Sequence, residues 1–124
     1  MIAHIVLFTP KPGVSEDDIR SFATLLVDTC SSIAEVKRAR VGRTLSVDAG
    51  YSRDFGYKTY QYSAVLEFES QEGLVRYLTN PLHGHLGRRF WELCESTVVM
   101  ESACVDPREA GSIDFLVKEQ NTSS

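Results

Sequence analysis

The chain has 124 residues, of which 43% are hydrophobic and 24% are charged, a composition typical of one folded domain and not of a disordered chain. The formal net charge is −4, and the densest basic runs are only Lys37-Arg38 with Arg40, and Arg88-Arg89. Because a nucleic-acid partner normally requires an extended basic face, these features argue against one.

The ends and the cysteines of the chain indicate a compartment. The first residues are apolar, but no basic segment precedes them and no small-residue cleavage site follows, so we expect no signal peptide. No apolar run approaches the roughly 20 residues that span a bilayer, so we expect no membrane partner. Cys30, Cys94 and Cys104 are far apart and odd in number, which favours reduced thiols. Together these features predict a cytoplasmic protein.

The first half of the chain predicts a strand, a helix and a second strand. Residues 2–9 are rich in β-forming side chains, with His4 as the only polar residue inside the run. Ser15 and Asp18 have the spacing of a capping box, which predicts that a helix begins there. A strand is expected over residues 38–47. The helix carries an apolar stripe at helical spacing, formed by Ile19, Phe22, Ala23, Leu26 and Cys30.

The second half predicts a strand, a helix in two pieces and a last strand. Alternate residues over 60–69 are strongly apolar, as in a half-buried strand. Ser70 caps a short helix, and Asn80-Pro81 starts a second piece, since asparagine suits the N-cap and proline the first helical position. A strand is expected over residues 97–105. The order β-α-β-β-α-β predicts a ferredoxin-like α+β fold, with an antiparallel sheet and both helices on one face.

The predicted first strand is apolar on both faces, because Ile5 and Leu7 point one way and Val6 and Phe8 the other. A chain of this length has no third layer, so the face without helices needs a cover from outside. A second copy, packed sheet to sheet about a two-fold axis, is the economical solution. The sequence therefore predicts a homodimer that forms a dimeric α/β barrel.

Three segments resemble those of stress-responsive A/B barrel (Dabb) domains. The chain opens with MIAHIVLFTPKPGVSEDDI, which has the family's histidine in the first strand and its K-x-G-V-S-E segment before the first helix. Further on come LEFESQEGLVRYLTNPLHGHL, which resembles the family's strand end, helix and H-P-x-H turn, and FWELCESTVVMES, which resembles its closing strand. The resemblance covers residues 1–105 as one domain and leaves residues 106–124 as a C-terminal tail.

The resemblance implies a dimeric α/β barrel and a candidate active site that uses no cofactor. A plant member of the family is a polyketide cyclase, which closes a linear poly-β-keto chain by an aldol reaction without a metal or organic cofactor. Its catalytic histidine and tyrosine fall on His83 and Tyr77, and its first-strand pocket histidine falls on His4. Asn80 replaces the first histidine of the family's turn. Leu26 stands near the place of a second pocket tyrosine, and this change removes a polar group.

Helical spacing separates the two histidines of the turn. His83 shares a stripe with Leu86, Phe90 and Cys94, so we expect it to face the core. His85 shares a stripe with charged residues and is expected at the surface. Two imidazoles two residues apart on a helix diverge by about 200°. No carboxylate or cysteine lies at ligand spacing beside them, so no metal site is expected.

Each candidate side chain also has a purely structural interpretation. His83 and His4 could be interior histidines that bond to the protein itself, and Tyr77 could be a core tyrosine. One hypothesis is a cofactor-free acid–base enzyme acting on a small hydrophobic keto or phenolic compound. Another is a non-catalytic dimeric module that binds a small hydrophobic ligand or serves a stress response. A third class, small cofactor-free monooxygenases, fits the family pattern less well. A pocket on which both histidines converge would favour a functional site.

Two further segments carry apolar side chains without an assigned role. The polar loop over residues 48–58 contains Tyr51, Phe55 and Tyr57, which either pack on their own barrel, the interpretation we prefer, or cover a pocket. The tail contains a small apolar island over residues 113–117. Since such an island seldom stays in water, we predict that the tail docks on its own barrel or on a partner.

Overall fold

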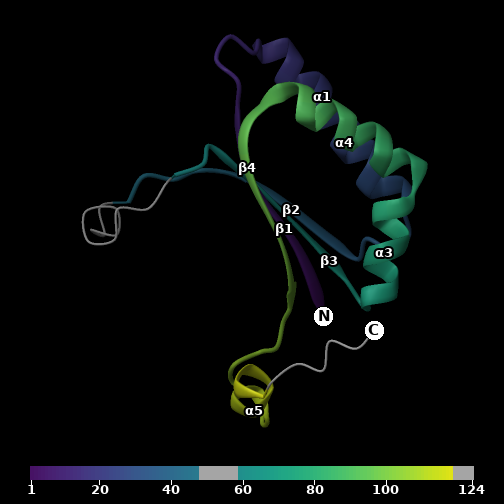
Figure 1. Cartoon of the computed structure of the whole chain (residues 1–124), viewed down its shortest axis with the longest axis vertical. Helices are drawn as coiled ribbons and strands as arrows, with labels where there is room; N and C mark the ends of the chain where they lie inside the picture. Colours follow the sequence, from purple (N-terminus) through teal and green to yellow (C-terminus); the bar gives the residue numbers. More distant parts are fainter. Residues whose placement is uncertain (48–58, 119–124) are drawn as a thin grey trace.

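The computed structural model describes residues 1–47 and 59–118. Its elements are β1 Ile2–Pro10, α1 Glu16–Ser32, β2 Arg38–Arg43, β3 Tyr62–Phe68, α3 Gln71–Thr79, α4 Pro81–Leu93, β4 Cys94–Ala103 and α5 Ser112–Val117. The strands pair in the order β2-β3-β1-β4, and every pair is antiparallel. Helices α1, α3 and α4 cover one face of this sheet and leave the other face open (Figure 1). The predicted ferredoxin-like α+β fold is confirmed.

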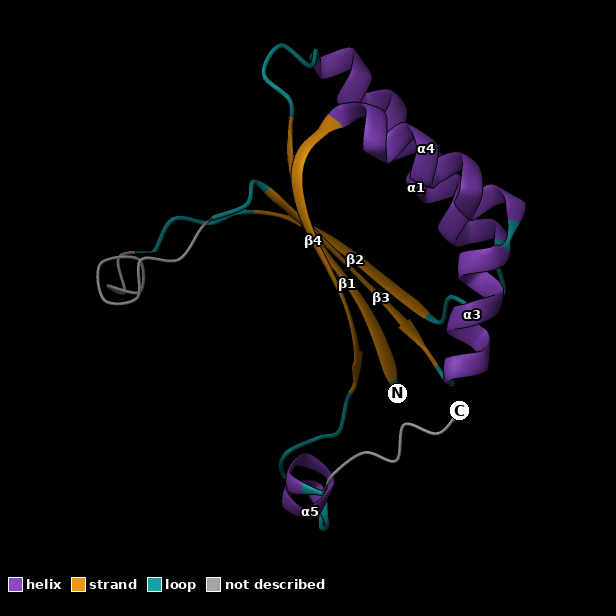
Figure 2. Cartoon of the chain, in the orientation of Figure 1, coloured by secondary structure: helices purple, strands orange, loops and turns teal. Residues whose placement is uncertain are grey.

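Local capping decides where the helices begin. Ser15 Oγ accepts a hydrogen bond from the Asp18 N–H at 3.0 Å, and the Asp18 carboxylate accepts one from the Ser15 N–H at 3.3 Å, the predicted capping box. The Asn80 side chain accepts a hydrogen bond from the Leu82 N–H, and Pro81 takes the first position of α4. The predicted two-piece helix is therefore α3 and α4, which run in different directions (Figure 2).

The two faces of the sheet differ in what covers them. His4, Val6 and Phe8 of β1 point toward the helices and line a cavity there. The alternate residues Ile5 and Leu7 point to the open face. Cross-strand pairing extends this open face with the apolar side chains of Val65, Val98 and Met100.

Two groups of apolar side chains hold the helices on the sheet. The group beneath α3 contains side chains that are at most 5% exposed, including Ile33, Leu66, Phe68, Leu74 and Tyr77. The group between α1 and α4 is built on Phe22, Leu86 and Leu93, with Phe8 and Phe90 packed against it. The cavity lies between the sheet and these helices.

The structure departs from the sequence prediction mainly at the ends of the strands. β2 ends at Arg43 instead of residue 47. β4 begins at Cys94 instead of residue 97, because β1 extends to Pro10 and pairs there with Cys94. The tail contains α5, a helix that its mostly polar composition did not predict. No helix in the described ranges is both long and apolar enough to cross a membrane.

Candidate active site

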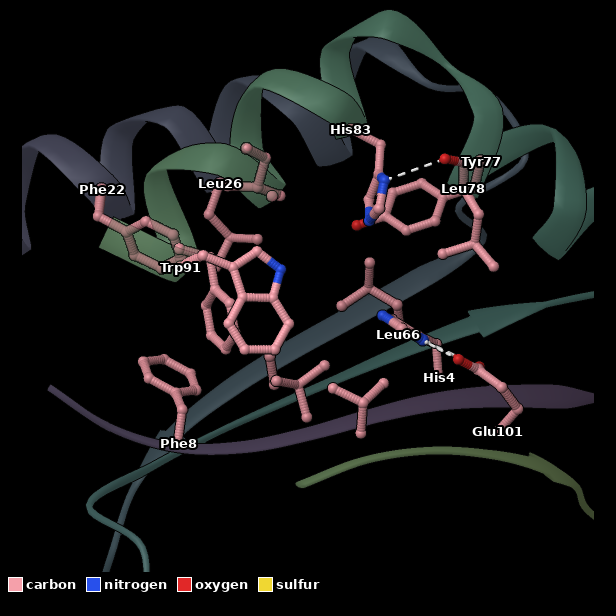
Figure 3. Close-up of a pocket in the computed structure, with 16 residues that line it drawn as sticks. His4, Phe8, Phe22, Leu26, Leu66, Tyr77, Leu78, His83, Trp91 and Glu101 are labelled. Atoms are coloured by element: carbon pink, nitrogen blue, oxygen red, sulfur yellow. Dashed lines mark hydrogen bonds and ion pairs between the residues drawn. The ribbon is translucent and has the colours of Figure 1, made fainter. Parts of the chain in front are cut away.

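A cavity of about 240 Å³ lies between the sheet and the helices (Figure 3). Strands β1, β3 and β4 form its floor, and helices α1, α3 and α4 form its roof. Its polar side chains gather at one end and are His4, Tyr77, His83 and Glu101. The rest of the wall is mainly apolar and includes Val6, Phe8, Phe22, Leu26, Phe90 and Trp91. A concave, largely apolar space with a few converging polar groups is typical of a small-ligand site.

The first turn of α4 places His83 at this cavity. Its Nδ1 lies 3.1 Å from the carbonyl oxygen of Leu78. Because a carbonyl oxygen only accepts hydrogen bonds, Nδ1 carries the hydrogen and Nε2 keeps its lone pair. Burial lowers the pKa of His83, and the neighbouring His4 lowers it further, against smaller opposing effects of the Leu78 carbonyl and Glu101. The imidazole is therefore neutral at neutral pH.

Tyr77 comes from α3 and lies beside both imidazoles. Its ring centroid is 4.7 Å from that of His83 and 5.9 Å from that of His4. Because α3 and α4 run in different directions, helical spacing does not decide whether Tyr77 reaches this site. The structure brings the three residues together. Burial raises the pKa of Tyr77, and nearby Cys30 and Glu101 raise it further, so the phenol keeps its proton.

The hydroxyl group of Tyr77 reaches the cavity. Within the described part of the chain, the Tyr77 hydroxyl makes no hydrogen bond. Every fully buried side-chain nitrogen or oxygen atom in that part of the chain does have a hydrogen-bond partner, so the Tyr77 oxygen is not one of the fully buried atoms. The hydroxyl is therefore not closed off in the core, although the residue as a whole is only 2% exposed. It remains available to donate a hydrogen bond to a bound molecule.

Glu101 is a site residue that the sequence interpretation missed. Antiparallel pairing of β1 with β4 places it directly opposite His4. Its two carboxylate oxygens lie 2.7 and 2.9 Å from His4 Nδ1. Since an ionised carboxylate only accepts hydrogen bonds, Nδ1 donates and the contact fixes the orientation of the imidazole. The available signal was a lone glutamate in an apolar closing strand, but using it required the pairing register.

The apolar end of the cavity adjoins a second, larger space. This second cavity, of about 510 Å³, lies between α1 and β2. Phe8, Phe22 and Leu26 line both spaces, so they form the wall between them. Trp91 lines the first cavity and is 63% exposed, so its side chain lies between that cavity and the solvent.

The sequence match agrees with this architecture. Residues 2–104 match the model of the stress responsive A/B barrel domain, Dabb. The chain belongs to this family. The matched range of the Dabb domain contains all four polar residues of the cavity and ends before α5. A comparison with curated proteins found no match.

Solved structures share the Dabb fold at low sequence identity. A protein of Arabidopsis thaliana is 20% identical, with a TM-score of 0.73 and coverage of 86% of this chain and 97% of that one. A hydroxynitrile lyase from Passiflora edulis is 18% identical, with a TM-score of 0.71 and coverage of 85% and 94%. A dimeric ferredoxin-like protein from Thermobifida fusca is 23% identical, with a TM-score of 0.67 and coverage of 83% and 90%. Identities this low show a common fold and no more.

The remaining candidate groups of the sequence lie outside the cavity. His85 is exposed on α4, as the helical spacing predicted. Among residues 1–47 and 59–118, no group of three or more histidine, cysteine or acidic side chains is arranged to hold a metal ion. The loop aromatics Tyr51, Phe55 and Tyr57 lie outside the described residues.

Proposed function

We propose that this Dabb protein is a homodimeric, cofactor-free acid–base enzyme that acts on a small hydrophobic keto or phenolic compound. The observation that carries the proposal is the convergence of His4, Tyr77 and His83 on one cavity. The three side chains come from β1, α3 and α4, so the fold assembles them in space although the sequence separates them. Their chemistry is complementary, since a neutral base and a neutral hydrogen-bond donor lie side by side.

In this proposal His83 is the general base. Its Nδ1 is held by the Leu78 carbonyl, so Nε2 is the nitrogen that takes a proton from a carbon next to a carbonyl group. The lowered pKa of His83 keeps this nitrogen unprotonated at neutral pH. A fixed tautomer and a neutral ring are the two properties that a base needs before the substrate arrives.

Tyr77 supplies the second role, a hydrogen bond to the oxygen of the developing enolate. Its raised pKa keeps the phenol protonated and thus able to donate. His4, held by Glu101, would orient the same end of the substrate. Positioned proton transfer of this kind typically contributes on the order of 10²–10⁴ to a rate.

The apolar wall supports a substrate with a hydrophobic part. Three phenylalanine rings lie together across from the polar end of the cavity. The ring centroid of Phe8 is 6.1 Å from that of Phe22 and 5.3 Å from that of Phe90. A reactive carbonyl at the histidines would place an apolar group against these rings. Leu26, near the place of a pocket tyrosine in the plant cyclase, leaves this wall without that hydroxyl, so we propose a less polar substrate than a poly-β-keto chain.

The open face of the sheet supports the homodimer. Val98 and Met100 are 43% and 52% exposed there, beside Ile5 and Leu7. A contiguous apolar surface on a monomer normally marks an interface. Sheet-to-sheet packing of two copies would cover it, and the related Thermobifida fusca protein is described as dimeric.

The alternative is a non-catalytic dimeric module that binds a small hydrophobic ligand. The observation in its favour is that both histidines already have partners within the protein, at Leu78 and at Glu101. Such contacts also occur around purely structural histidines. Both the enzyme and the binding module need a cavity, but only the enzyme would convert a bound compound into a product.

The test compares His83→Asn with the matched control His85→Asn, which changes an exposed histidine of the same helix. Both variants and the parent are assayed with a panel of apolar β-keto, phenolic and hydroxynitrile compounds, and binding is followed by the fluorescence of Trp91, the one tryptophan of the chain. We expect His83→Asn to lower turnover by roughly 10²-fold or more and His85→Asn to leave it unchanged. Binding without turnover in the parent protein would instead support the non-catalytic module. Unchanged turnover and binding in His83→Asn would leave His83 as a structural residue.

A further inference from the structure

Helix α5 presents an apolar face that its own chain leaves uncovered. Ile113, Leu116 and Val117 stand at helical spacing on one side of the helix and are 73%, 68% and 73% exposed. A helix of six residues is too short to be stable alone in water. Packing against another surface would therefore stabilise it.

The opposite side of α5 is where it contacts its own chain. Ser112 is buried and donates a hydrogen bond through Oγ to the Pro107 carbonyl at 2.9 Å, and Phe115 is half-buried. No side-chain hydrogen bond caps the helix at Gly111. The helix is thus anchored on one side and turns its apolar face outward.

A second apolar projection lies at the other end of the sheet. The chain leaves β2 through residues 44–47 toward the open side of the sheet, and α5 lies on that same side beyond the end of β4 (Figure 1). Residues 44–47, here called the hairpin base, expose Leu45 by 81% and Val47 by 68%. The open face therefore lies between two apolar projections, one at each end of the strands.

We propose that α5 is a docking arm for a second copy of this chain, and that its apolar face packs on the hairpin base of the partner. The proposal rests on the homodimer proposed above and adds a contact between the two copies that stabilises the dimer. If the two-fold axis runs across the strands, the α5 end of one copy meets the hairpin end of the other. Each dimer then contains the contact twice.

Charge favours this contact over a contact between the two α5 helices. Helix α5 contains one charged residue, Asp114, so two α5 helices packed side by side would bring like charges together. Strand β2, which leads into the hairpin base, carries three arginines and no acidic residue. Helix α5 also lies outside the residues that match the family, 2–104, so the family match does not specify this contact.

Cross-linking of the full-length chain tests the contact. In a Cys104→Ser background, which removes the exposed thiol, one protein carries Leu45→Cys and a second carries Leu116→Cys. The two are mixed, oxidised and separated without reductant, and each is also oxidised alone, so a linked product that forms only in the mixture contains one chain of each kind. We expect this mixed product, and we expect little product from Leu116→Cys alone.

A second measurement is independent of cysteine chemistry. Leu116→Asp adds a negative charge to the apolar face, whereas Lys118→Gln makes the same change in net charge just beyond the helix. We expect the dimer dissociation constant to rise about tenfold or more for Leu116→Asp, and to change little for Lys118→Gln. A dimer that forms without the mixed cross-link and is unaffected by Leu116→Asp overturns the arm and leaves the homodimer standing. Efficient linking of Leu116→Cys to itself would show that the two α5 helices lie side by side, and it overturns the proposed contact between α5 and the hairpin base. A monomeric parent protein, seen by light scattering, overturns both the arm and the homodimer.

Discussion

The helix-covered face and the open face of the sheet share the same strands but carry different kinds of residue. On the covered face, the polar groups of β1 and β4 have partners, as in the contact between His4 and Glu101. On the open face, Ile5 and Leu7 are surrounded by further apolar residues. In this chain the helices cover the face that carries the polar cluster of His4, Tyr77, His83 and Glu101. The other face is left for a partner to cover.

The largest effect is expected from the core beneath the helices. Phe68 is fully buried, whereas Met100 on the open face is 52% exposed. Phe68→Ala should lower the free energy of unfolding by about 3–5 kcal/mol, because the side chain leaves a cavity that the core cannot fill. Met100→Ala should have a clearly smaller effect. Urea unfolding at one fixed protein concentration measures both variants. Equal losses would mean that the two faces are covered to the same extent.

A charge at the centre of the open face should sharpen the comparison further. Leu7→Asp would place a carboxylate without a partner in the proposed dimer interface. The dimer should weaken by about 3 kcal/mol, roughly 100-fold in the dissociation constant. Light scattering across a dilution series measures the mass. Thr24→Asp, on the exposed side of α1, serves as the control and should leave the dimer intact. If Leu7→Asp forms a dimer as stable as that of the parent protein, the dimer interface does not include the open face.

The smallest effect is expected from acid, on the covered face. The pKa of His83 in the folded protein lies below its ordinary value of 6.5, chiefly because of burial. As the pH falls below 6.5, the unfolded chain takes up a proton before the folded protein does, so the free energy of unfolding decreases. His83→Asn should reduce this decrease, and His85→Asn should not. Urea unfolding of the three proteins at pH 7 and at pH 5 measures the decrease in the free energy of unfolding. The same slope in all three proteins would contradict the lowered pKa.

The sequence could predict features that depend on local spacing. The Ser15 capping box, the Asn80-Pro81 restart and the inward direction of His83 follow from residues within a few positions of each other. Alternation along β1 separated its two faces, although a shift of one residue would have exchanged them. The family resemblance, not the pattern, assigned His4 to the side of His83.

Features that depend on tertiary placement could not be predicted. Tyr77 reaches the cavity because α3 and α4 meet at an angle, which no helical repeat specifies. Glu101 faces His4 only through the register between β1 and β4. The sequence shows the apolar island of the tail, but its helix and the direction of its exposed face depend on the backbone beyond β4.

The contact between His4 and Glu101 also bears on how the protein is made. It joins residues 97 positions apart, and it belongs to the pairing of the first strand with the last strand of the sheet. Contacts of such long sequence separation form slowly, since the intervening chain must first be ordered. During synthesis, β1 can pair with β4 only after nearly the whole domain has left the ribosome. We therefore expect the polar end of the cavity to be completed late in folding, and a chain that stops within β4 before Glu101 lacks the carboxylate that holds His4.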